Sequence, residues 1–180
     1  MMAAIATCKV WMQQTPIGTI SVLSGPNGLR RIALPGDDLG PVPDGTVDAR
    51  DPRIAKQLEE YFSGRRHTFD LTLDLSDVHG AFSRRALEAL QRDVPWGETI
   101  SYGELAELAG SPRGGRAAGQ AMRRNPIPIV IPCHRVIQSS GALGGYAGRA
   151  QWDRIKIQLL AHEGSDGFAL SDANRLSAAG

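Results

Sequence analysis

The run Asn125–Ile137, with the sequence NPIPIVIPCHRVI, is the feature that most restricts how this chain can fold. Its three prolines prevent a regular helix and remove backbone donors that a central strand needs. The residues between them are mostly apolar and favour burial. We therefore expect a rigid, extended, strand-like segment that ends at Cys133 and leaves its thiol little freedom to move.

A histidine, His134, follows Cys133 directly. Adjacent side chains on an extended backbone diverge, so a direct hydrogen bond between them is not expected and a proton relay would need a water. By itself, such a pair also arises by chance in a structural segment. Its interpretation therefore depends on the residues around it.

Positive charge is concentrated in and just before this run. The net charge of the chain is only +1, but residues 111–135 contain five arginines and no acidic residue. A segment of one charge sign predicts contact with phosphates, and a solvated basic face is the alternative. The arginines are Arg113, Arg116, Arg123, Arg124 and Arg135.

The chain has two cysteines, Cys8 and Cys133, which are too few for a disulfide framework. We expect both to be reduced, with Cys8 as a small buried thiol in an N-terminal strand. The cysteines and histidines lack the spacing of a metal site, so neither a metal nor another cofactor is expected. No basic leader and no apolar run of about 18 residues occurs, so we expect a cytoplasmic protein.

Residues 1–76 are predicted to form a small α/β domain. Apolar and polar residues alternate from 8 to 34 around two turn signals, which predicts a hairpin or small meander. Residues 35–50 are rich in Pro, Gly and Asp and are expected to form a mobile loop. Asp51 and Pro52 then predict the start of a helix that ends at Gly64, and alternation over 69–75 predicts a further strand.

Residues 77–164 are predicted to be mostly helical. An apolar stripe over 82–90 indicates one helix. Ser101 and Glu104 form a capping-box pattern, which opens a short helix that ends at Gly110.

A second short helix is expected to begin at Ser111–Pro112 and to run to about Arg124, giving a helix-turn-helix. Small residues dominate it, and Arg116 stands among them within the first two turns. A bare surface at the positive end of a helix suits close approach to a phosphate backbone, and tight packing in an ordinary helical hairpin is the alternative. The small residues are Gly114, Gly115, Ala117, Ala118, Gly119 and Ala121.

Taken together, these motifs resemble the O6-alkylguanine-DNA alkyltransferase family. The likeness rests on Pro132–Arg135, the sequence PCHR. It covers residues 81–164 through further motifs in family order and spacing, and it continues more weakly into the N-terminal part. These motifs are Ile100–Tyr102, Arg116–Ala117, Ala121–Arg123, Asn125–Pro126, Gly144–Tyr146 and Leu159–Gly164.

The resemblance implies an α/β (α+β) fold. A small ribonuclease-H-like sheet with a helix is expected over 1–76, a mostly helical domain with a winged-helix-like helix-turn-helix over 77–164, and a loose tail over 165–180. The implied activity is direct reversal of damage in double-stranded DNA, by a single, irreversible transfer of an alkyl group from the guanine oxygen to the protein. O4-alkylthymine is a further candidate substrate. A monomer is expected, and cooperative binding on DNA is left open.

By the same resemblance, Cys133 is the alkyl acceptor. His134 would generate its thiolate through a bound water, and Glu163 would orient and charge the imidazole. Asn125 would tie the helix-turn-helix to the active-site strand through backbone hydrogen bonds. Lys156 would pack beside Cys133.

The resemblance also assigns the residues that handle DNA. Tyr102 would hydrogen-bond the extruded guanine and crowd the phosphate that must rotate, while Arg116 would fill the vacated space from the minor groove. Arg113, Ala117 and Arg123 are expected to bind DNA as well.

The implied substrate pocket contains five residues besides the acceptor. The carbonyls of Cys133 and Val136 would accept from the guanine amino group, and Pro128 and Tyr146 would wall the alkyl pocket with Lys156 nearby. Ala147 stands where several relatives have serine, so only a backbone amide would contact the guanine oxygen there. The zinc ligands of some N-terminal domains in the family are absent here, apart from Cys8.

Two other functions fit parts of the sequence. A lesion-binding protein without transfer activity would lack the cysteine, so Cys133 argues against it. A Cys–His hydrolase or transferase acting on small molecules would turn over repeatedly, and it would leave the arginine-bearing small-residue helix unexplained.

Overall fold

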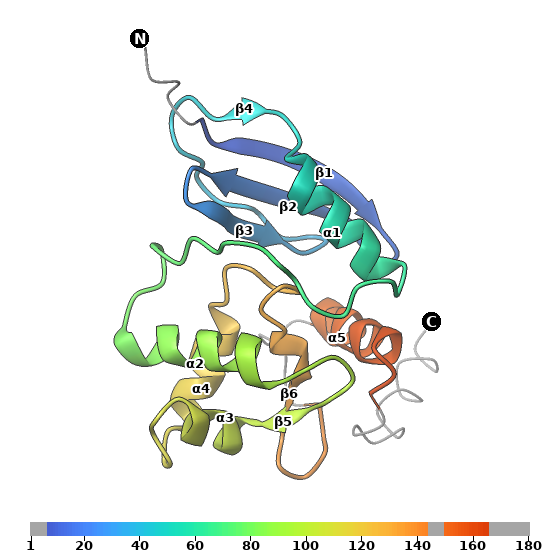
Figure 1. Ribbon diagram of the computed structural model, residues 1–180. Helices are drawn as coiled ribbons and strands as arrows, with labels where there is room; N and C mark the ends of the chain where they lie inside the picture. The colour runs from blue at the N-terminus through green and yellow to red at the C-terminus, as the bar shows by residue number, and fades with distance from the viewer. Residues whose placement is uncertain (1–6, 144–149, 166–180) are drawn as a thin grey trace. The chain divides into compact units, whose positions relative to one another are not determined.

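The computed structural model describes residues 7–143 and 150–165. By its contacts the chain divides into two compact units, one of residues 1–77 with 126–128 and the other of residues 78–125 with 129–180. The first unit carries a β-sheet with one helix, and the second is mostly helical (Figure 1). The predicted mixed α and β class is therefore confirmed.

The first unit is built on a four-stranded sheet. Its strands are β1 (Lys9–Thr15), β2 (Gly18–Gly25), β3 (Gly28–Ala33) and β4 (Val47–Asp48), in the order β3-β2-β1-β4. The first three are antiparallel, so the predicted meander is confirmed, and β4 pairs parallel to β1. The strand β4 lies within the predicted loop 35–50. Its two residues are both exposed, so no hydrophobic alternation marks it in the sequence.

The helix α1 (Pro52–Phe62) packs on this sheet as its sequence predicts. The Asp51 side chain accepts hydrogen bonds from the amides of Arg53 and Ile54 at 3.1 and 3.2 Å, which satisfies donors that the first turn leaves unpaired. Its apolar face is buried through Ile54, Ala55, Leu58 and Tyr61. Gln13 on β1 donates to the carbonyl of Ala55 at 3.3 Å and thereby joins helix and sheet.

The segment 69–75 is not the regular strand that its alternation predicts. It makes one bridge, between Leu73 and Leu29 of β3, with Leu29 donating to the Thr72 carbonyl at 2.9 Å. At the start of the segment, the side chain of Gln57 makes the hydrogen bonds that a neighbouring strand would make. It donates to the Asp70 carbonyl at 3.0 Å and accepts from the Asp70 amide at 2.9 Å. A side-chain amide therefore satisfies backbone groups that a ladder would otherwise pair.

The second unit contains α2 (Ala81–Asp93), β5 (Ile100–Ser101), α3 (Tyr102–Leu108), α4 (Gly115–Arg123), the 3₁₀ turn η1 (Cys133–Arg135), β6 (Val136–Ile137) and α5 (Ala150–His162). The helices α2, α3 and α4 pack on one another, and α5 packs on η1. The strands β5 and β6 pair in parallel, Ile100 with Val136 and Ser101 with Ile137. This pairing sets the start of α3 beside the chain that leaves η1.

The helix-turn-helix differs from its prediction at the start of its second helix. The capping box at Ser101 and Glu104 is present in both directions, as predicted. The helix α4, however, begins at Gly115 rather than at Ser111–Pro112. The Gly114 amide instead donates to the Ser111 carbonyl at 2.8 Å, so these four residues form a turn before the helix.

The proline-containing run is also not a regular strand. Ile129 has a φ of +76°, a left-handed conformation that a β-branched residue rarely adopts. The chain then enters the 3₁₀ turn, where the Arg135 amide donates to the Pro132 carbonyl at 2.9 Å. The prolines therefore exclude regular structure, as predicted, but they produce a turn at Cys133 instead of an extended end.

The close approach of Gly28 to the segment 69–75 generates a stability prediction. Gly28 has a φ of +118°, and a Cβ placed there would lie 2.2 Å from the carbonyl oxygen of Thr72. Gly28→Ala should lower the free energy of unfolding by about 3 kcal/mol, because it combines backbone strain with a clash that only the main chain can relieve. Urea unfolding followed by circular dichroism measures this change.

Gly45→Ala is the matched control, since Gly45 has a φ of +76° and no atom within 4 Å of the added carbon. It should cost about 1 kcal/mol from the left-handed backbone alone. Equal losses for the two variants would show that the Thr72 contact contributes nothing.

Candidate active site

The thiol of Cys133 is buried at the first residue of η1, only 2% exposed. The side-chain amide of Asn125 donates to its sulfur at 3.1 Å and to the Ile131 carbonyl at 2.8 Å. Asn125 follows the end of α4 by two residues. One amide group therefore joins the end of the second helix to both the sulfur and the segment that leads to it.

His134, Glu163 and Arg135 form a buried charge cluster next to this thiol. Glu163, which follows α5 directly, has an oxygen 2.8 Å from His134 Nε2. Arg135 donates to both carboxylate oxygens, from Nε at 2.7 Å and from Nη2 at 2.9 Å. Its Nη1 also donates to the Val94 carbonyl, at 2.6 Å, which links the cluster to the end of α2.

The cluster sets the protonation states of its members. Burial alone would raise the pKa of the Glu163 carboxyl, but hydrogen bonds from His134 and Arg135 outweigh it and hold that pKa well below its ordinary value. Burial lowers the pKa of the His134 imidazole; Glu163 opposes this, while the charges of Arg135 and Lys156 add to it. An ionised Glu163 thus faces a neutral imidazole.

The tautomer of His134 follows from these states. A carboxylate accepts hydrogen bonds, so we assign the imidazole proton to Nε2, which leaves the Nδ1 lone pair available as a base. Nδ1 is buried and has no hydrogen-bond partner among the described residues.

Lys156 is a second buried positive charge near the thiol. Its side chain has no exposed surface, and Nζ donates to the carbonyls of Val136 at 2.6 Å and Leu143 at 2.7 Å. Burial lowers the pKa of Lys156 to about 8, while the charges of Cys133 and Asp153 oppose that shift. The Val136 carbonyl, predicted to accept from guanine, already accepts from this ammonium.

One side of the helix-turn-helix is buried and the other is exposed. Ala118, Ala121 and Met122 are buried against the rest of the unit. Four of the predicted DNA-binding residues lie on its exposed part: Arg113, Arg116, Ala117 and Arg123. Tyr102, the fifth, is half-buried at the start of α3; burial raises its hydroxyl pKa, and the nearby Cys133 adds to the shift.

Arg135 corrects the charge interpretation of the sequence. The sequence predicts that it faces phosphates with the other four arginines, but it is 5% exposed, and each of its three nitrogens donates to Glu163 or to the Val94 carbonyl. The exposed basic set is therefore Arg113, Arg116, Arg123 and Arg124. The sequence does not reveal that Arg135 is buried, because its partner Glu163 lies 28 residues further along the chain.

Several other predicted residues have definite positions. Pro128 and Val136 are both buried, Pro128 in the first unit and Val136 in the second. Tyr146 and Ala147 lie outside the described residues, as does the tail beyond residue 165. Cys8, expected to be buried, is half-buried just before β1.

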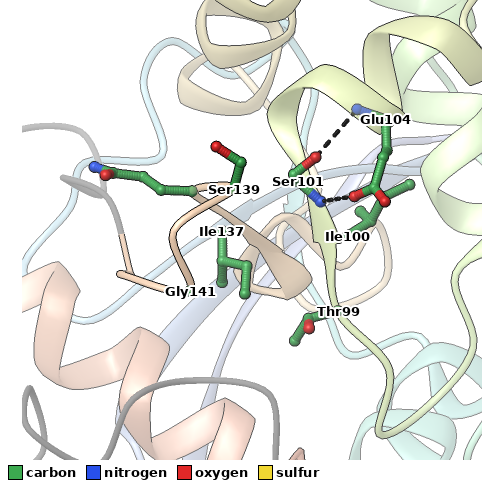
Figure 2. A pocket seen from close by; sticks show the side chains of 8 residues that line it. Thr99, Ile100, Ser101, Glu104, Ile137, Ser139 and Gly141 are labelled. Atoms are coloured by element: carbon green, nitrogen blue, oxygen red, sulfur yellow. Dashed lines mark hydrogen bonds between the residues drawn. The ribbon is translucent and has the colours of Figure 1, made fainter.

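A pocket of about 440 Å³ opens between the start of α3 and the chain that follows β6 (Figure 2). Thr99, Ser101, Glu104 and Ser139 give it a polar lining, and Figure 2 shows the two capping-box hydrogen bonds at its wall. None of the predicted acceptor-site residues lines it. Its polar groups Ser101 and Glu104 are already used to cap the helix.

Residues 7–143 and 150–165 contain no group of three or more potential metal-binding side chains. No helix in these ranges has the length and apolar character needed to cross a membrane.

Comparison with known proteins places the chain in one family. Residues 81–165 match the description "6-O-methylguanine DNA methyltransferase, DNA binding domain", and residues 12–75 match its "ribonuclease-like domain". The methylated-DNA--protein-cysteine methyltransferase of Rattus norvegicus is 38% identical, over 91% of this chain and 85% of the relative. The constitutive enzyme of that name from Bacillus subtilis is 39% identical, over 75% and 84%.

Solved structures agree with these relatives. The crystal structure of Mycobacterium tuberculosis OGT in complex with DNA superposes with a TM-score of 0.76 at 34% identity, covering 88% of this chain and 96% of that one. The O6-methylguanine methyltransferase of the same organism has a TM-score of 0.73 at 33% identity, covering 88% and 93%. The chain therefore belongs to the methylated-DNA--protein-cysteine methyltransferase family.

Proposed function

We propose that this protein repairs alkylated DNA by moving an alkyl group, such as methyl, from the O6 atom of guanine in double-stranded DNA to the sulfur of Cys133. The observation that carries the proposal is the buried Cys133 thiol. It accepts a hydrogen bond from Asn125, and the next residue, His134, is paired with Glu163. The names of the relatives, which act on methylated DNA and a protein cysteine, support it.

The transfer is a single displacement. The Cys133 thiolate attacks the alkyl carbon, a sulfur–carbon bond forms, and the carbon–oxygen bond to the base breaks. The electron pair of that bond goes to the base, which takes up one proton and remains in the DNA as guanine. The proton balances the one that the thiol loses. A thioether has no leaving route under these conditions, so each protein molecule acts once.

The buried cluster supplies the means to form the thiolate. The free Nδ1 lone pair of neutral His134 takes the thiol proton, through a bridging water, and Glu163 stabilises the imidazolium that results. The Asn125 amide donates to the sulfur, an interaction that strengthens when the sulfur becomes negative. Arg135 keeps Glu163 ionised and fixed in orientation.

The helix-turn-helix supplies the contact with DNA. The exposed guanidinium groups of Arg113 and Arg123 reach phosphates, and the small exposed Ala117 permits close approach. We assign α4 to the minor groove, where Arg116 occupies the space of the extruded base and Tyr102 contacts that base. The solved complex of the Mycobacterium tuberculosis relative with DNA supports such an interface.

The remaining assignments follow from this chemistry. The thiol must survive until it meets a lesion, and neither Cys8 nor Cys133 forms a disulfide in the structure, so we place the protein in the reducing cytoplasm. The Val136 carbonyl accepts from Lys156, and in this proposal these two residues belong to the substrate pocket together with Tyr146 and Ala147. A small-molecule Cys–His hydrolase is the rival function, and it requires repeated turnover.

The stoichiometry of transfer tests the proposed function. Mixed with DNA that contains O6-methylguanine, the protein should take up one methyl group per molecule and then stop. Cys133→Ser should take up none, because its hydroxyl is a far weaker nucleophile than a thiolate. Mass spectrometry of the intact protein measures both results.

Cys8→Ser is the matched control, since Cys8 is the other free cysteine, and it should retain full uptake. Uptake beyond one group per molecule, or release of products without modified protein, would show catalytic turnover and exclude the proposed function.

Removing the charge of Glu163 tests the proton relay. Glu163→Gln should slow methyl transfer at neutral pH by about 10²–10⁴-fold, because the imidazolium loses its counter-charge. It should also destabilise the protein by about 3–5 kcal/mol, because Arg135 is left buried and unpaired. Single-turnover kinetics and urea unfolding measure the two effects.

The pH dependence has a definite sign. Since folding lowers the pKa of Glu163, its contribution to stability is complete above the ordinary carboxyl pKa of about 4.3 and is lost as the pH falls below that value. Glu163→Gln should lack this acid-induced loss, whereas Glu107→Gln, at an exposed position on α3, should keep it. Parallel acid profiles for wild type and Glu163→Gln would contradict the assigned charge state.

A substitution at Arg116 tests base extrusion. Arg116→Ala should slow repair in duplex DNA at least about tenfold and leave reaction with free O6-methylguanine base nearly unchanged, because only the duplex needs the vacated space filled. Arg65→Ala removes an equal charge from an exposed site in the first unit and should spare both reactions. Equal losses on duplex and free base would remove Arg116 from this role.

A further inference from the structure

The α2–β5 turn, residues 94–98, takes no part in the proposed transfer step. The Glu98 amide donates to the Pro95 carbonyl at 3.2 Å, which closes a four-residue turn. Gly97 is the third residue of this turn and has a φ of +83°. Glycine adopts such a left-handed conformation without strain, whereas other residues do not. The local backbone therefore calls for glycine at this position even before its neighbours are considered.

Gly97 also lies against the backbone of Glu163. A Cβ placed at Gly97 would be 3.2 Å from the Glu163 carbonyl oxygen, which is tighter than such contacts normally are. The backbone there is fixed by the end of α5, where Gly164 has a φ of +66° and the Ser165 amide donates to the Leu160 carbonyl at 3.0 Å. A side chain at position 97 would thus press on the residue that carries the relay carboxylate.

Two further residues of the turn contact neighbours of that carboxylate. The rings of Trp96 and His162 meet edge to face, with 5.2 Å between their centroids. His162 directly precedes Glu163 in the chain. The Val94 carbonyl accepts from Arg135, whose guanidinium also donates to both carboxylate oxygens. The α2–β5 turn therefore contacts the backbone of Glu163, the residue before it and its ion-pair partner.

We propose that the α2–β5 turn positions the Glu163 carboxylate at His134 Nε2. Gly97 does so by carrying no side chain against the Glu163 carbonyl, and Trp96 does so by its contact with the preceding residue. The inference rests on the proposed function, since it concerns the relay that forms the Cys133 thiolate. The carboxylate oxygen lies 2.8 Å from Nε2, and such a hydrogen bond weakens as its length or angle departs from the normal range.

The first test compares two glycines that share a left-handed backbone. Gly97→Ala should slow methyl transfer from free O6-methylguanine base at pH 7 about tenfold, because a small displacement of a relay group costs a factor of this order. Gly64→Ala is the matched control and should react at the wild-type rate, since Gly64 has a φ of +72° and no atom within 4 Å of the added carbon. Single-turnover kinetics measure both. Equal rates for the two variants would overturn the inference.

A double-mutant cycle separates a positioning role from a purely structural one. In the Glu163→Gln background the carboxylate is already lost, so adding Gly97→Ala should change the rate by less than about twofold. A glycine that only supports the fold would lower the rate by the same factor in both backgrounds. That outcome would also overturn the inference.

The contribution of Trp96 is tested by changing its ring. Trp96→Leu removes the aromatic edge that meets His162 and should slow transfer from the free base about threefold, the loss expected for one aromatic pair. Trp96→Phe keeps a ring at this position and should restore most of the wild-type rate. A Trp96→Phe protein as slow as Trp96→Leu would exclude Trp96 from the positioning role.

The His134 imidazole gives a measurement that needs no kinetics. Its Nε2 proton is buried and bonded to Glu163, so it should give a slowly exchanging, downfield signal in ¹⁵N-histidine-labelled protein. This signal should move upfield in folded Gly97→Ala, because the hydrogen bond is longer, and should stay in place in Gly64→Ala. An unmoved signal in folded Gly97→Ala would overturn the inference. Wild-type uptake of one methyl group per molecule would still support the proposed function in that case.

Discussion

The geometry of the acceptor region depends on one carboxylate. Glu163 is the shared partner of His134 and Arg135, and through Arg135 it reaches the Val94 carbonyl at the end of α2. A buried carboxylate is tolerated only with such partners, because the loss of hydration must be offset by charge-assisted hydrogen bonds. The same contacts orient the imidazole and anchor η1 to two helices. The hydrogen bonds that stabilise this part of the fold are thus the same ones that orient the His134 imidazole.

Two buried cations, Arg135 and Lys156, lie in this unit. Arg135 neutralises Glu163, so the carboxylate stabilises an imidazolium without forcing His134 to be charged at rest. Lys156 is a second buried cation of the same unit, and its hydrogen bonds to the carbonyls of Val136 and Leu143 hold the chain that follows η1.

Local motifs in the sequence predicted local structure well. The Asp51 cap, the Ser101–Glu104 capping box and the strand meander each depend on residues within a few positions of one another, and all three occur. Two of the predictions that were wrong involve partners that are distant in sequence. Gln57 takes the place of a strand beside Asp70, and Arg135 turns inward to Glu163 instead of outward to solvent.

For the segment that leads to Cys133, the sequence predicts the absence of regular structure but not the conformation that the backbone adopts. The prolines correctly excluded helix and central strand, but the left-handed Ile129 and the 3₁₀ turn at Cys133 depend on packing that no local pattern encodes. The side-chain amide of Asn125 lies 3.1 Å from the Cys133 sulfur. The bonds of Lys156 to Val136 and Leu143 had no counterpart in the sequence, because backbone carbonyls accept from any residue that reaches them.

The separation between His134 and Glu163 has a consequence for the order of events during synthesis. The two residues that meet at 2.8 Å are 29 positions apart, so the carboxylate leaves the ribosome after the thiol, the imidazole and Arg135 are already exposed. Until α5 docks, the guanidinium has no counter-charge and the imidazole no acceptor, and η1 has little reason to adopt its turn. The turn at Cys133 therefore gains these two charge partners only after α5 and Glu163 have been synthesised.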